Sequence, residues 1–75
     1  MSWREHIVSD PRIYHGQVCI EGTQVPVSVV LDNLAAGVSE DEILREYPFL
    51  GEDSIRASVA YAAELARERV SSLTA

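Results

Sequence analysis

The residues best suited to chemistry stand in the first third of the chain, where His6, His15 and Cys19 occur among turn residues. A thiol activated by a neighbouring histidine is a common nucleophile, so a His-Cys-Asp site around Cys19 and His15 is one hypothesis. Nothing in the spacing orders these side chains, and they match no usual zinc pattern. Gly16 and Gly22 are too far apart for a phosphate-binding loop. We therefore expect no catalytic site, metal, cofactor or small-molecule substrate, and we expect Cys19 to be buried.

The composition is that of one small globular domain. A chain of 75 residues buries only about 60% of its unfolded surface, and its one cysteine allows no internal disulfide. Small domains of this kind often gain the missing burial by oligomerising, so a homodimer is expected. No apolar run is long enough to cross a membrane, and the start MSWREHIVSD lacks the apolar core of a signal peptide. The expected location is the cytoplasm.

The charge balance favours some partners over others. Twelve acidic residues stand against six basic residues, all arginine, which gives a net charge of −6. This charge repels a phosphate backbone and disfavours DNA, because nucleic-acid-binding domains usually carry a basic patch. A basic protein partner fits the charge better.

The first 26 residues predict a β/loop segment. Ile7-Val8 and Val18-Cys19-Ile20 read as short strands, with a hairpin expected between Ile13-Tyr14 and Val18-Ile20. Gly22-Thr23 is expected to reverse the chain before a helix begins near Pro26. Because a two-stranded ribbon is unstable alone, this segment must pack on helices or on another chain.

Residues 27–70 predict three helices, and the tail 71–75 is expected to be frayed. The first helix ends at Gly37, and its inward stripe is Val27, Val30, Leu31, Leu34 and Ala35. Ser39 and Glu42 form a capping box for a short second helix, which Pro48 stops. The third helix reaches about Arg69, with an expected inward stripe of Ile55, Val59, Ala62 and Ala66. The predicted fold is therefore α+β and mostly α, a three-helix bundle behind a short β-hairpin segment.

The second and third helices are typical of a helix-turn-helix, although an ordinary three-helix packing unit fits the pattern equally well. Arg45 and Arg56 are the residues that could contact DNA. Residues 39–56 hold six acidic residues against these two arginines, which makes a poor DNA surface.

The outer helix faces fit a protein partner better. Ala57, Ala60 and Tyr61 form an expected ridge of small residues with one aromatic anchor, and Val29 lies on the outer face of the first helix. Scattered exposed apolar residues also occur without any function. The expected partner or dimer contacts are Glu21, Gln24, Val29, Arg56, Ala57, Tyr61 and Glu64.

The order of these features resembles domain-of-unknown-function family 433. The resemblance runs from about Ile7 to Ala63 and is carried by Asp10-Pro11, Gly22-Thr23, Val25-Pro26-Val27, Gly37, Tyr47-Pro48 and Tyr61-Ala62. It implies a homeodomain-like three-helix bundle that forms a homodimer. It also implies similarity to VapB-type antitoxins, which inhibit a PIN-like ribonuclease toxin encoded beside them and repress the shared operon.

The chain departs from the family pattern at positions that often carry a basic residue. Gln17, Glu21 and Gln24 stand there instead, and Gly51 replaces a hydroxyl cap. Each lost basic residue removes a phosphate contact. We therefore expect a small dimeric antitoxin-like protein that binds a PIN-like ribonuclease toxin. The alternative is a stand-alone helix-turn-helix DNA-binding transcription regulator.

Overall fold

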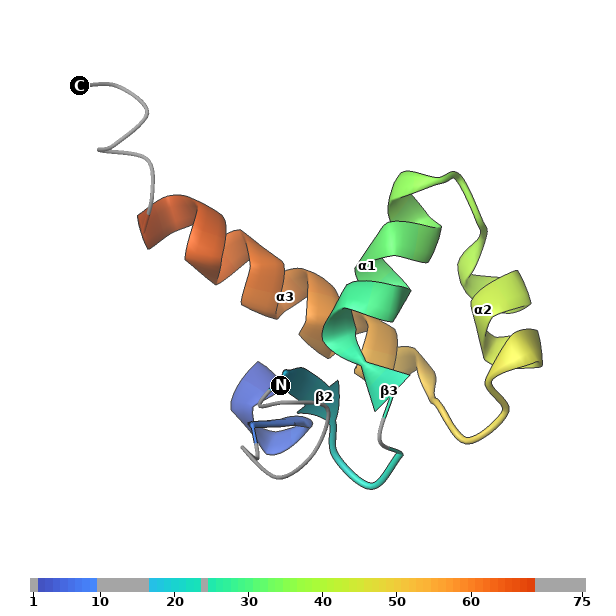
Figure 1. Cartoon of the computed structure of the whole chain (residues 1–75), viewed down its shortest axis with the longest axis horizontal. Helices are drawn as coiled ribbons and strands as arrows, with labels where there is room; N and C mark the ends of the chain where they lie inside the picture. The colour runs from blue at the N-terminus through green and yellow to red at the C-terminus, as the bar shows by residue number, and fades with distance from the viewer. Residues whose placement is uncertain (1, 10–16, 24, 69–75) are drawn as a thin grey trace.

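The computed structural model describes residues 2–9, 17–23 and 25–68 of this α+β chain. Within these ranges, a short 3-10 helix and a small sheet stand beside three α-helices (Figure 1). The elements are η1 (Trp3–Glu5), β1 (Ile7–Ser9), β2 (Val18–Ile20), β3 (Val25–Pro26), α1 (Val27–Ala35), α2 (Glu40–Glu46) and α3 (Glu52–Glu68). No described helix has both the length and the hydropathy needed to cross a membrane.

The sheet is antiparallel, with strand order β1-β2-β3. Ile7 pairs with Ile20 on one edge of β2, and Val25 pairs with Ile20 on the other edge. The reversal expected at Gly22-Thr23 is confirmed, since Gly22 has φ 81° and Thr23 Oγ1 donates to the Ile20 carbonyl at 2.8 Å. The other half of the expected hairpin, Ile13-Tyr14, lies outside the described residues.

Val25-Pro26 adds a third strand that the sequence pattern did not predict. Pro26 lacks a backbone N–H, so it is tolerated in an edge strand such as β3. Its φ of −63° and ψ of 142° are extended, and the same residue is the N-cap of α1. One proline therefore ends the sheet and starts the helix without a loop between them.

The expected helix ends at Gly37 and Ser39 are confirmed. Gly37 has φ 88°, and its N–H donates to the Leu34 carbonyl, while the Val38 N–H donates to the Asn33 carbonyl. This pair of bonds is a Schellman motif, which favours glycine because of the left-handed backbone. Two residues later, Ser39 Oγ accepts from the Glu42 N–H at 3.2 Å and caps α2.

The α2–α3 connection is built from residues 47–51. α2 ends after Glu46, just before Tyr47-Pro48. At the start of α3, the Gly51 N–H donates to Ser54 Oγ at 3.2 Å and the Ser54 N–H donates to the Gly51 carbonyl at 3.0 Å. This reciprocal pair substitutes for the side-chain cap that glycine lacks.

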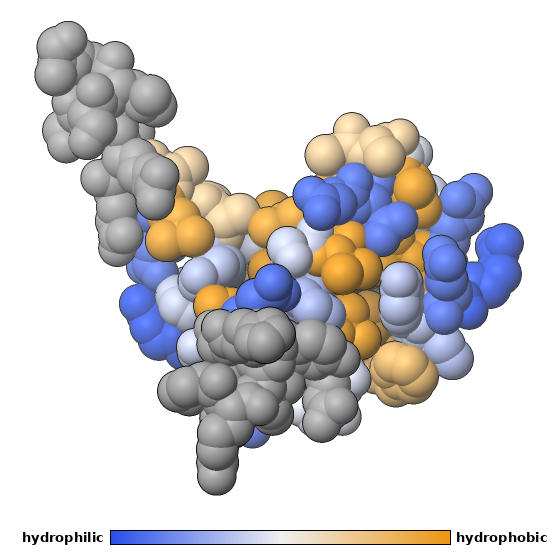
Figure 2. Space-filling model, viewed as in Figure 1, coloured by the Kyte–Doolittle hydropathy of each residue, from blue (hydrophilic) through white to orange (hydrophobic). Residues whose placement is uncertain are grey.

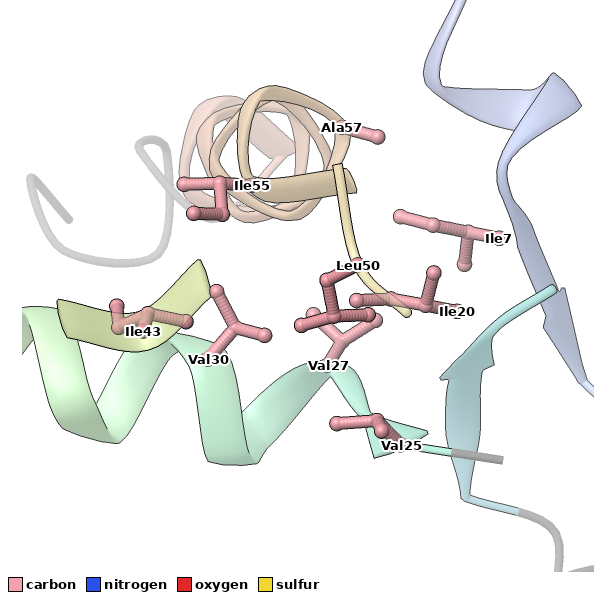
Figure 3. Packing of buried hydrophobic residues seen from close by; sticks show 9 residues of the cluster. All are labelled: Ile7, Ile20, Val25, Val27, Val30, Ile43, Leu50, Ile55 and Ala57. Atoms are coloured by element: carbon pink, nitrogen blue, oxygen red, sulfur yellow. The ribbon is translucent and has the colours of Figure 1, made fainter. Parts of the chain in front are cut away.

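The core gathers side chains from the strands, α1, α2 and α3 around Leu50 (Figure 3). Val30, Ile43 and Ile55 are almost fully buried there. The buried cluster consists of Ile7, Ile20, Val25, Val27, Val30, Ile43, Leu50, Ile55 and Ala57. The N-terminal strands are thus held by the same cluster that joins the helices.

The expected inward stripe of α3 is wrong by about one residue. Ile55 is buried as expected, but Val59 is 47% exposed and Ala66 is exposed. Ala57 and Ser58 are 0% exposed instead. Polar Ser58 is tolerated inside because its hydroxyl donates to the Ser54 carbonyl at 2.9 Å. Ala57 fills the side of α3 that faces Ile7 and the strands (Figure 3).

The burial of Ala57 predicts that the same substitution has different effects at two alanine positions. Ala57→Leu should lower the free energy of unfolding by about 1–3 kcal/mol, because extra methylenes enter a filled core. Ala35→Leu, at an exposed position of α1, should change it by less than about 0.5 kcal/mol. Urea denaturation of both variants measures the difference. Equal effects would mean that the buried face of α3 is wrongly placed.

Candidate protein-binding surface

Cys19 is in the core and not at an accessible site. It is 4% exposed, and its Sγ donates to the Gln17 carbonyl at 3.5 Å. Burial raises the pKa of the Cys19 thiol, so less of the reactive thiolate forms at a given pH. His15, its proposed partner, lies outside the described residues. Buried Cys19 therefore does not support the hypothesis of a thiol nucleophile.

A shallow groove opens where β2, the start of α1 and the middle of α3 meet. Its volume is about 290 Å³, and it is lined by Gln17, Val18, Val27, Ser28, Leu31 and Tyr61. Apolar surface gathers between α3 and α1, while hydrophilic residues dominate the surface beyond α1, towards α2 (Figure 2). Tyr61 is therefore one of the side chains that line this groove.

Tyr61 also supports the N-terminal segment. The Trp3 ring stands edge-on to the Tyr61 ring, with centroids 5.1 Å apart and an interplanar angle of 72°. This is a favoured geometry for aromatic pairs, because the positive ring edge meets the negative ring face. The Arg4 guanidinium lies 4.5 Å from the centroid of the Trp3 ring. Trp3 and Arg4 thus form one cluster with Tyr61 and Glu64 of α3.

Glu64 is the polar centre of that cluster. Its Oε2 accepts from Trp3 Nε1 at 3.0 Å and from Arg4 Nη2 at 3.3 Å. The Arg4 side chain is 66% exposed and that of Glu64 is 33% exposed. An ion pair this exposed contributes at most about 1 kcal/mol to stability, so it holds the segment weakly.

The other predicted contact residues have different outcomes. Ala57 is fully buried, so its expected place on the outer ridge is wrong. Val29 is half-buried and packs against the core. Glu21 is exposed, and Gln24 lies outside the described residues. The two proposed DNA contacts, Arg45 and Arg56, are both exposed.

Phe49 is an exposed aromatic residue that the sequence pattern did not single out. It is 65% exposed in the connection between α2 and α3. Exposed carboxylates flank it three residues away on each side, at Glu46 and Glu52. The signal that could have found it is its position: Leu50 and Ile55 already fill the staple positions at this helix start, leaving Phe49 without a packing role.

The described residues contain no group of three histidine, cysteine, aspartate or glutamate side chains placed to hold a metal ion. What the geometry offers is a set of exposed apolar side chains on an acidic surface. That arrangement suits contact with another macromolecule.

Comparison with known proteins agrees with the family resemblance. The model of a family described as "Protein of unknown function (DUF433)" matches residues 7–62. The chain belongs to the DUF433 family. It is 39% identical over 59 residues to the uncharacterized protein y4eO of Sinorhizobium fredii (strain NBRC 101917 / NGR234). That match covers 79% of this chain but only 27% of y4eO, and no solved structure matches significantly.

Burial of Cys19 in this DUF433 chain predicts slow thiol chemistry. Alkylation by iodoacetamide at mildly alkaline pH should run about tenfold or more slower in the folded protein than in urea, because both accessibility and the thiolate fraction are reduced. Mass spectrometry over time measures the two rates. Equal rates would place Cys19 at the surface and reopen the nucleophile hypothesis.

Proposed function

We propose that this DUF433 protein is a dimeric, antitoxin-like protein that binds and inhibits a basic, PIN-like ribonuclease. The observation that carries the proposal is the exposure of Phe49 between carboxylates at the α2–α3 connection. An aromatic side chain that enters a partner's pocket supplies affinity, and a polar rim around it excludes water.

The charge of the chain supports a basic partner. The six acidic residues of segment 39–56 are all exposed, and the net charge of the chain is −6. An acidic surface accelerates encounter with a basic one, while apolar contacts slow dissociation. A ribonuclease surface that binds RNA phosphates has the complementary charge.

The match to y4eO also supports a role as a contact module. There, a sequence similar to this chain accounts for 27% of a longer protein. A domain with its own core can present its binding surface when it is joined to other sequence.

We assign the dimer contact to the outer strip of α3. Val59 is 47% exposed, and Ala63 and Ala66, also exposed, follow it at intervals of four and three residues. These positions share one helical face, and small residues let two helices approach closely. A second copy of α3 would bury these three apolar side chains, which are exposed to solvent in the monomer.

The alternative function is DNA binding by a homeodomain-like helix-turn-helix made of α2 and α3. The exposure of Arg45 and Arg56 favours it. The acidic residues around both arginines oppose it, because they repel the phosphate backbone.

Removal of the aromatic anchor should weaken partner binding. Phe49→Ala is expected to reduce affinity for the captured ribonuclease about tenfold or more, with little change in stability because the ring is 65% exposed. Val8→Thr, at another exposed apolar position, is the matched control. The tagged protein is expressed with its neighbouring genes, and native mass spectrometry of the complex identifies the partner before titration.

A captured ribonuclease that binds wild-type and Phe49→Ala proteins equally would remove Phe49 from the interface. If no partner is captured and upstream DNA binds with an affinity that falls steeply with salt, the DNA-binding alternative replaces the proposal. In that case Arg45→Ala and Arg56→Ala should each reduce the salt dependence.

A separate variant tests the assigned dimer contact on α3. Val59→Glu should convert the dimer to a monomer, because the two copies would bring carboxylates into an apolar contact. Light scattering after size exclusion measures the mass, and circular dichroism should show unchanged helix content. Val8→Glu, also at an exposed valine, should leave the dimer intact.

A further inference from the structure

The N-terminal clasp, residues Ser2 to Glu5, is held to α3 by side chains. Its own turn is short: Ser2 Oγ accepts from the Arg4 N–H at 3.3 Å, and the Glu5 N–H donates to the Ser2 carbonyl at 3.2 Å. Beyond this turn, Trp3 meets the Tyr61 ring and both Trp3 and Arg4 donate to Glu64. The clasp is therefore bound to α3 much as a short peptide is bound to a protein surface.

The surface beneath the clasp recognises two chemical groups at once. The Tyr61 ring receives an aromatic side chain, and the Glu64 carboxylate receives both an indole N–H and a guanidinium. A partner segment with an arginine beside an aromatic residue would offer the same groups. Tyr61 also lines the apolar groove, so a segment bound here could extend into the groove.

We propose that Tyr61 and Glu64 form a docking site for an aromatic-arginine segment of a partner, and that the chain's own clasp occupies this site in the free protein. The partner displaces the clasp when it binds. This inference rests on the proposed function for the identity of the partner, while the docking site itself can be tested without one.

The contacts of the clasp are suited to displacement. No residue of η1 is buried, and the Arg4 side chain is mostly exposed. A solvent-exposed ion pair contributes little and is weakened by salt. The clasp competes with a partner segment for this site because it is tethered to the chain, which gives it a high effective concentration. Its individual contacts are weak.

The direct test uses a synthetic probe, the peptide acetyl-Ser-Trp-Arg-Glu-amide, added to the full-length chain. In the Trp3→Ala variant the site is vacated, so the peptide should bind at least about tenfold more tightly than to the wild type. The amide signals of residues 61 and 64 in two-dimensional NMR spectra should shift during the titration. Circular dichroism checks that Trp3→Ala has kept its fold, and Arg4→Ala supplies a second, milder opening of the clasp.

Two controls distinguish specific recognition of the peptide from non-specific binding. Peptide binding should be lost in Trp3→Ala/Glu64→Ala and retained in Trp3→Ala/Asp32→Ala, which removes one exposed carboxylate from α1. A peptide with alanine in place of arginine should bind more weakly to Trp3→Ala. Equal binding to wild type and Trp3→Ala, or binding that survives loss of Glu64, would overturn the docking site.

The clasp also provides an optical signal, because Trp3 is the only tryptophan. In the full chain, Glu64→Ala should make Trp3 emission more accessible to acrylamide quenching, while Asp32→Ala should not. If the captured ribonuclease binds without changing Trp3 quenching, the displacement is wrong while the antitoxin-like function stands. A dimer that becomes monomeric in Trp3→Ala would place the clasp on the second copy and overturn its role within one chain.

Discussion

One small apolar cluster holds this chain together, and Leu50 lies at its centre. Leu50 comes from the connection between α2 and α3, and it belongs to the cluster that joins the strands to all three helices. A domain this small cannot form a second core. Every element must therefore pack against the same cluster, and apolar side chains that cannot contact it remain exposed.

The position of that cluster decides which part of α3 is covered. The core takes Ile55, Ala57 and Ser58 from the first half of the helix. Further along, Tyr61 is only partly buried against the core and also contacts the clasp, and Leu65 is 40% exposed. Phe49 is left outside for a related reason, since its neighbour Leu50 takes the position that points inward. The exposed apolar side chains on which the proposed partner contacts rest are thus a consequence of how little the core can hold.

The acidic character of the chain determines which kind of partner these exposed side chains would favour. Apolar contact alone selects no partner, whereas carboxylates around an aromatic anchor favour a basic surface and disfavour nucleic acid. Within the chain, Glu64 accepts from the Arg4 guanidinium as well as from the Trp3 indole. The same electrostatic logic links the proposed ribonuclease partner to the site beneath the clasp.

The sequence by itself determined the family, the three helices and the backbone signals at their ends. Gly22, Gly37 and Ser39 could be read directly because each acts through its own local backbone. Only the tertiary structure decided the buried face of α3. Ala57 is buried there instead of the expected Val59, together with Ser58, whose hydroxyl donates to the carbonyl of the preceding helical turn. The tertiary structure alone paired Val25-Pro26 with the sheet and brought Trp3 to Glu64, 61 residues away. Those outcomes depend on how separate elements share one core, and a local pattern carries no information about that sharing.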